Sequence, residues 1–143
     1  MIVVATDQEY EMAKKRFKGE PIIKTGIGAL NVAKALKDCP KNAHITNFGY
    51  AGSNNIPPES EVRIGKCRLY HPNVKYDEPE YNLNGETTCY KSCDFVTETD
   101  IKEPAAFDME LAFILAQGFT NVESIKIISD NLSLDQYKEK VNG

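Results

Sequence analysis

The chain has 143 residues, of which 41% are hydrophobic and 27% are charged, and its formal net charge is −4. This length and composition predict one soluble globular domain over residues 1–143 that can bury a sizeable core. The acidic balance argues against nucleic-acid polymers and anionic membranes as main partners, because both reward a concentrated positive face. It favours a small molecule.

No apolar run in the sequence approaches the roughly 20 residues that a membrane span needs. Residues 1–5 lack the basic region of a signal peptide, so we expect a cytoplasmic protein. The cysteines and histidines are Cys39, Cys67, Cys89, Cys93, His44 and His71. The cysteines form no CxxC pair, which predicts reduced, mostly buried thiols and no metal site.

The first third of the chain alternates apolar runs with amphipathic segments. Its predicted elements are a strand at 2–5, a helix capped by Thr6 or Asp7 that runs to about Phe17, a strand at 21–24, a helix at 29–36 and a strand at 43–48. Acids in the first turn of the first helix suit the helix dipole. The third strand leads into a predicted loop at 49–53, whose glycines let backbone N–H groups approach a ligand.

The rest of the chain continues this alternation. Its predicted elements are a strand at 62–70, a polar segment at 72–86, short strands at 87–90, 95–97 and 105–108, a helix at 110–117, a strand at 122–128 and a final helix at 132–141. The polar segment at 72–86 is the best candidate for a mobile loop. Gly118 is expected to terminate the helix at 110–117. The pattern predicts an α/β fold, a single domain of three layers around a central mixed, largely parallel sheet.

Gly26-Ile27-Gly28 follows a predicted strand and opens a helix, as a dinucleotide-binding motif does. The third glycine of that motif is missing, because Asn31 occupies its place. We therefore expect no nicotinamide, flavin or other cofactor.

Several short motifs place acids and glycines near the ends of predicted elements. In chain order they are Glu9 after the first strand, Thr25-Gly26-Ile27-Gly28, Asn47-Phe48-Gly49-Tyr50-Ala51-Gly52, Phe107-Asp108-Met109-Glu110 and Ile128-Ser129-Asp130. Taken alone, an acid after a strand is more often a helix cap or a turn residue. The ordered set resembles the nucleoside phosphorylase superfamily, and within it the methylthioadenosine/S-adenosylhomocysteine nucleosidases, over most of the chain. The resemblance implies a phosphorylase-like fold in a shortened member.

The resemblance gives the acids roles in cleaving a purine N-glycosidic bond, which develops positive charge on the sugar and negative charge on the base. Asp130 is then the general acid that protonates purine N7, oriented by Ser129, and Glu9 is the base that activates water. The implied function is a purine nucleosidase acting on adenosine-type nucleosides.

The resemblance also implies a substrate pocket. Glu110 accepts hydrogen bonds from two vicinal ribose hydroxyls, and Met109 packs against the sugar. Phe95 and Val96 form the face and the edge of the purine slot.

Three further positions belong to the implied site. Gly49 and Tyr50 lie in the glycine-containing loop near the attacking water, where the nucleosidases have a serine at the position of Tyr50. Lys126 stands where they have an arginine, and a lysine does not reproduce a guanidinium fork.

Two alternatives remain open. A phosphate-dependent phosphorylase needs arginines around the phosphate, and the position where the phosphorylases carry one is occupied by Asn47. Water is therefore the favoured nucleophile. A non-catalytic nucleoside- or base-binding relative is the other alternative. The resemblance also implies a homodimer in which residues 70–74 complete a neighbour's pocket, with His71 on the 5′ side of the substrate.

Overall fold

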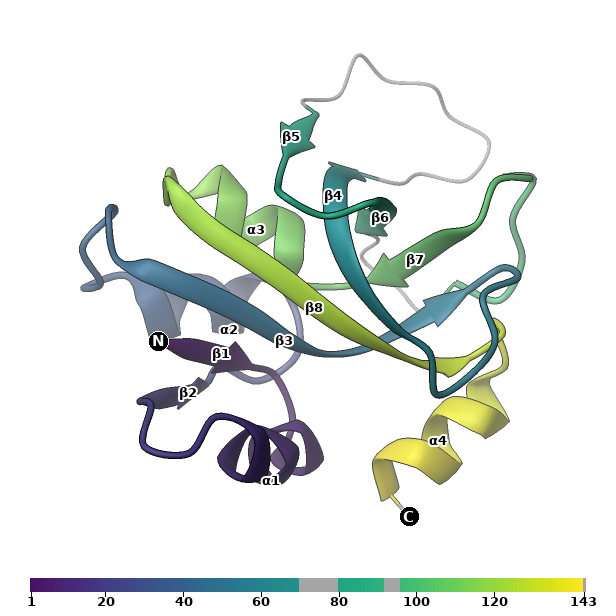
Figure 1. Ribbon diagram of the computed structural model, residues 1–143, viewed down its shortest axis with the longest axis horizontal. Helices are drawn as coiled ribbons and strands as arrows, with labels where there is room; N and C mark the ends of the chain where they lie inside the picture. The colour runs from purple at the N-terminus through teal and green to yellow at the C-terminus, as the bar shows by residue number, and fades with distance from the viewer. Residues whose placement is uncertain (70–79, 92–95, 143) are drawn as a thin grey trace.

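The computed structural model describes residues 1–69, 80–91 and 96–142 (Figure 1). Within these residues, eight strands form one mixed sheet, accompanied by four helices. The strands are β1 (Ile2–Val4), β2 (Ile22–Lys24), β3 (His44–Ser53), β4 (Glu61–Leu69), β5 (Tyr81–Asn82), β6 (Thr87–Lys91), β7 (Ala105–Asp108) and β8 (Asn121–Asp130). The helices are α1 (Asp7–Arg16), α2 (Ala29–Leu36), α3 (Leu111–Ala116) and α4 (Leu134–Asn142). None of these helices is long and apolar enough to cross a membrane.

The sheet runs from a parallel edge into a closed ring. β2, β1, β3 and β8 are parallel neighbours, and β3 and β8 lie side by side across Figure 1. β8 then pairs antiparallel with β4, β4 pairs parallel with β6, and β6 pairs parallel with β7. Since β7 returns to the end of β3 in an antiparallel pair, β3, β8, β4, β6 and β7 close on themselves. The expected mixed, largely parallel sheet is confirmed.

Helices cover both faces of the parallel strands at the β2–β1–β3 side of the sheet. Apolar side chains that alternate between the two faces of these strands need a packing partner on each face. Val3 of β1 packs with Leu36 of α2 on one face, in a cluster that α3 completes. Ile2 and Val4 point to the other face and pack with Ala13 of α1. A helix layer on each side of the sheet therefore gives the predicted three layers.

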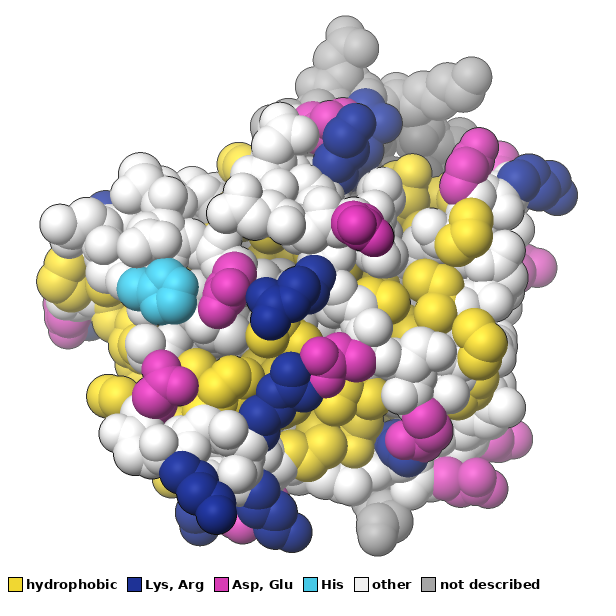
Figure 2. Space-filling view, viewed as in Figure 1, with side chains coloured by type: hydrophobic (Ala, Val, Ile, Leu, Met, Phe, Trp, Pro, Cys, Tyr) yellow, Lys and Arg dark blue, Asp and Glu magenta, His cyan; other side chains and the backbone are white. Residues whose placement is uncertain are grey.

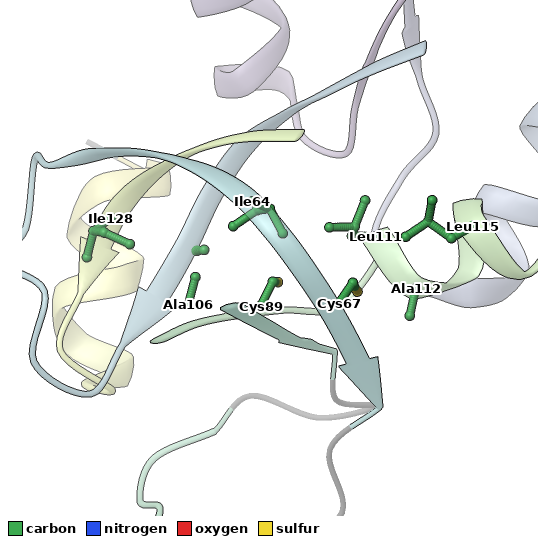
Figure 3. Packing of buried hydrophobic residues seen from close by; sticks show 9 residues of the cluster. Ile64, Cys67, Cys89, Ala106, Leu111, Ala112, Leu115 and Ile128 are labelled. Atoms are coloured by element: carbon green, nitrogen blue, oxygen red, sulfur yellow. The ribbon is translucent and has the colours of Figure 1, made fainter. Parts of the chain in front are cut away.

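A third core cluster joins α3 to the ring of strands (Figure 3). Its buried members are Ala51, Ile64, Cys67, Cys89, Ala106, Leu111, Ala112, Leu115 and Ile128. Small side chains are frequent among them, which lets the strands of the ring approach α3 closely. This packing fixes the start of α3 against the ends of β7 and β8.

The face of the molecule shown in Figure 2 carries basic and acidic side chains interspersed with one another. Ion pairs connect α1 to β4, β4 to β8, and α4 to the turn before β4. They are Arg16–Glu61, Arg63–Glu123 and Lys140–Glu59. Because both partners in these pairs keep contact with solvent, each contributes no more than about 1 kcal/mol to stability.

Local sequence signals place several elements correctly. α2 and β7 have the predicted bounds, and Gly118 follows α3 with a φ of 92°, as a helix-terminating glycine does. Thr6 caps α1: its hydroxyl accepts the Glu9 N–H at 3.2 Å, and Glu9 Oε1 accepts the Thr6 N–H at 3.0 Å. This reciprocal capping box explains why α1 begins where it does.

Other predictions are wrong or untested. The predicted loop at 49–53 is the second half of β3, paired with β8 and β7. Tyr81–Asn82 pairs with β4 as β5 instead of lying in a loop, and residues 96–97 are in no strand. Residues 70–79 and 92–95 lie outside the described part of the chain. The predictions made for His71, Cys93 and Phe95 therefore remain predictions.

Candidate active site

A cavity of about 280 Å³ opens where the C-terminal ends of β1, β2, β3, β7 and β8 come together. Its described lining residues are Thr6, Glu9, Ile27, Tyr50, Ala51, Gly52, Val96, Phe107, Asp108, Met109, Glu110, Ser129, Leu132, Leu134 and Tyr137. The carboxyl ends of strands are where open α/β sheets bind ligands, and the volume is near the lower end of small-molecule sites, roughly 300 Å³. The cavity therefore brings together most of the residues that the sequence singled out.

Three backbone N–H groups hold the carboxylate of Glu9, which is buried. Ala5 and Thr6 donate to Oε1 at 2.9 and 3.0 Å, and Tyr50 donates to Oε2 at 2.7 Å. A Cβ on Gly49 would lie 2.3 Å from Oε2, so a side chain at position 49 would displace the Glu9 carboxylate. Gly49 thus makes room for Glu9 and is not itself among the described lining residues. Glu9 serves the capping box and the cavity wall at once.

Asp130 ends β8 with a fully buried side chain. The Ser129 hydroxyl donates to its Oδ1 at 2.6 Å, and the Leu132 N–H donates to Oδ2 at 2.9 Å. Burial raises the pKa of Asp130, against the opposing effect of these hydrogen bonds. Ser129, Gly52 and Leu132 line the cavity, and the Asp130 carboxyl lies behind them. A raised pKa suits an acid that must hold its proton near neutral pH.

Glu110 stands at the N-terminal end of α3 and faces the cavity beside Met109. Among the described residues, its Oε2 is the buried side-chain oxygen that has no hydrogen-bond partner. Burial, followed by the negative charge of Asp108, raises the pKa of Glu110 to about 8, against the opposing effects of Lys126 and the Gly28 amide. An unpartnered carboxyl oxygen in a cavity wall is an acceptor available to a ligand.

Asp108 and Lys126 form a buried ion pair that the sequence did not reveal. Lys126 Nζ lies 3.1 Å from Asp108 Oδ2, and each side chain is 2% exposed. Burial alone would lower the pKa of Lys126, but the charge of Asp108 and its neighbours outweighs burial and leaves that pKa raised. The structure places the Lys126 ammonium on Asp108, and Lys126 is not among the described lining residues of the cavity.

The segment after β8 supplies lining residues that sequence reasoning missed. They are Leu132, Leu134 and Tyr137. Burial raises the pKa of Tyr137, and the charges of Glu9, Glu110 and Asp130 add to this effect. The sequence did contain a signal for these lining residues. The final helix directly follows a strand that ends in an acid, and such a helix starts at the edge of the sheet where ligands bind.

Two other residues that the sequence singled out, Tyr50 and Val96, line the cavity. Tyr50 contributes to the wall, while its hydroxyl donates to the Met12 sulfur at 3.3 Å. Val96 lines the cavity from the segment before β7. Phe95, its predicted partner in the purine slot, lies outside the described residues.

No protein-family model matches the chain, and no curated protein matches it by sequence. Its three-dimensional structure does have counterparts. The fold is that of the 5′-methylthioadenosine/S-adenosylhomocysteine nucleosidases, a nucleoside phosphorylase-like architecture with a central mixed sheet.

Three solved structures illustrate the similarity. The nucleosidase of Helicobacter pylori, with butyl-thio-DADMe-Immucillin-A, aligns at a TM-score of 0.77 and 13% identity over 98% of this chain and 89% of that chain. The enzyme of Neisseria meningitidis, with methylthio-immucillin-A, gives 0.76 and 15% over 98% and 90%. The MTAN of Chlamydia trachomatis bound to MTA gives 0.75 and 17% over 96% and 86%.

Proposed function

We propose that the protein is a purine nucleosidase that hydrolyses the N-glycosidic bond of adenosine-type nucleosides such as methylthioadenosine. The observation that carries this proposal is the unpartnered Oε2 of Glu110, buried in the wall of a cavity that also contains Glu9 and borders Asp130. A carboxylate with a free oxygen matches two vicinal sugar hydroxyls. The likeness in fold to nucleosidases solved with nucleoside analogues supports the same substrate class.

In the proposed reaction, Asp130 donates its proton to purine N7, and the bond between C1′ and N9 breaks as the base leaves neutral. A water oxygen bonds to C1′ while Glu9 takes a proton from that water. Glu110 holds the two ribose hydroxyls and stabilises the positive charge that develops on the sugar. General acid–base help of this kind contributes roughly 10²–10⁴ in rate for each group.

Water is the proposed nucleophile because a phosphate dianion finds no cation here. None of the described lining residues of the cavity is basic, and the Lys126 ammonium is engaged by Asp108. Asn47 is buried, and its side-chain oxygen accepts the Ser124 hydroxyl at 2.8 Å. The described lining of the cavity therefore lacks the arginines with which a phosphorylase would bind phosphate.

The position of Asp130 favours a second candidate, a nucleoside-binding protein without turnover. The carboxyl is buried and is not among the described lining residues of the cavity, and its Oδ2 accepts the Leu132 N–H, so it reaches a purine only if its surroundings rearrange. If they do not rearrange when a nucleoside binds, Glu110 still holds the sugar while the acid step fails.

The test is release of free base from methylthioadenosine, adenosine and inosine, each with and without phosphate. We expect release that is independent of phosphate, lost in Asp130→Asn and in Glu9→Gln. Matched controls are Asp135→Asn and Glu11→Gln, which change exposed acids on α4 and α1. Release that requires phosphate would establish the phosphorylase, and saturable binding without release would establish the binding protein.

We further propose a single domain over residues 1–143 that acts in the cytoplasm as a homodimer. Ile27 and Leu30 support an apolar contact beside the cavity, because their side chains are exposed in the isolated chain. Light scattering on purified protein measures the mass, and a monomer at micromolar concentration would contradict the dimer.

A further inference from the structure

We propose that Asp108 is a positioning residue that holds the Lys126 ammonium away from Glu110, so that the Glu110 carboxyl stays free to bind vicinal hydroxyls of the sugar. This inference rests on the proposed function only in naming Glu110 as the group that binds the sugar.

Three donors hold the Asp108 carboxylate in place. Its Oδ1 accepts the Cys89 thiol at 3.4 Å, and its Oδ2 accepts the Leu111 N–H at 2.9 Å and lies 3.1 Å from Lys126 Nζ. These donors come from β6, α3 and β8. The bond to Leu111 fixes the turn between Asp108 and α3, and this turn directs Met109 and Glu110 into the cavity.

Positive charge is scarce among the buried side chains. Among the described residues, Lys126 is the only buried basic residue, and Glu9, Asp108 and Glu110 all lie close enough to affect its pKa. A buried cation pairs with whichever carboxylate is best placed, because an unpaired buried charge is costly. Glu110 follows Asp108 among the carboxylates that raise the Lys126 pKa, and Glu110 and Lys126 line one small enclosed space, so Glu110 is the carboxylate we expect the ammonium to meet without Asp108.

The surroundings of the Glu110 carboxyl leave one of its oxygens without a partner. Asp108 and Glu9 are its negative neighbours, Lys126 is its positive neighbour, and the Gly28 amide donates to it. A direct bridge to Lys126 would occupy the free Oε2. The ion pair with Asp108 instead keeps the cation close enough to lower the pKa of Glu110 in part, and it leaves Oε2 without a partner in the protein.

The experiment compares the binding of adenosine and 2′,3′-dideoxyadenosine by calorimetry, at a pH above the pKa of Glu110. Every protein carries Asp130→Asn so that adenosine is not hydrolysed, and wild type here means that Asp108 and Lys126 are unchanged. The wild type is expected to prefer adenosine. Asp108→Asn keeps an acceptor for Leu111 but loses the charge, so it should bind adenosine roughly 10- to 100-fold more weakly, the worth of hydrogen bonds to a charged group. Its affinity for dideoxyadenosine should stay at the wild-type value, which a general loss of structure would not allow.

The double variant Asp108→Asn/Lys126→Met is the second protein and covers the case in which Asp108→Asn alone does not fold, because it leaves no unpaired buried ammonium. Since no cation then competes for Glu110, the preference for adenosine should return toward the wild-type value. Asp7→Asn, which breaks the exposed Asp7–Lys24 pair, is a control with an unchanged preference. A folded Asp108→Asn protein with the full wild-type preference, or a folded double variant without the preference, would overturn the proposal. Because binding is measured, the inference can hold even if no turnover is found, and a wild type without the preference would refute it.

Discussion

Replacing Glu110 by glutamine tests the buried carboxyl directly through stability. The pKa of Glu110 is about 8 in the folded chain, against an ordinary value of 4.5. Between these values the unfolded chain has lost the proton that the folded chain keeps, so stability falls as pH rises and levels off above the folded pKa. At about 1.4 kcal/mol per pH unit, the total loss is at most about 5 kcal/mol. Glu110→Gln has no proton to lose and escapes this loss.

The assay is urea unfolding of the wild type and Glu110→Gln at a series of pH values. The two proteins should differ little below the ordinary carboxyl pKa, and the variant should become more stable, by up to about 5 kcal/mol, above the folded pKa. Glu98→Gln is the control, because Glu98 is exposed. A difference that stays constant across the range, or one that favours the wild type at high pH, would refute the reasoning.

Three other substitutions test the supports of the site. Gly49→Ala puts a Cβ 2.3 Å from Glu9 Oε2, so we expect hydrolysis to fall by roughly 10² or more; an unchanged rate in a steady-state assay would remove Glu9 from the mechanism. Thr6→Ala loses a helix cap and should lower the free energy of unfolding by about 1 kcal/mol, with recovery in Thr6→Ser; equal melts of the two variants would contradict the cap. Arg16→Ala breaks the exposed pair with Glu61 and should change that free energy by under about 1 kcal/mol; a larger loss in urea would show a stronger link between α1 and β4.

The elements that were predicted well are those whose signal is local. α2 is amphipathic and ends before a proline, and the Thr6 box starts α1. The prediction for 49–53 failed because a local rule assigned glycines to a loop. Gly49 suits its place in β3 because a distant acid, Glu9, occupies the space where a side chain at position 49 would be. Such a contact across the fold cannot be inferred from neighbouring residues.

The same distinction applies to the site. Resemblance pointed to Glu9 and Glu110, and the structure places both in the cavity wall. Asp108 belongs to one of the motifs that the sequence singled out, but no role was predicted for it. The signal that did exist was Lys126, a lysine inside the apolar run of β8, since a buried lysine requires a carboxylate partner. The sequence could announce that partner but not identify it as Asp108.

The positions of the acids also bear on which is the acid and which the base. Glu9 accepts three backbone N–H groups and shares its surroundings with the Lys126 cation. Asp130 lies buried at the end of β8, where burial raises its pKa and the opposing contributions come from Ser129 and backbone amides. The influences on the Asp130 pKa include no positive charge, and burial raises that pKa, as a proton donor requires. The environment of Asp130 therefore supports the proposed donation of its proton to the purine.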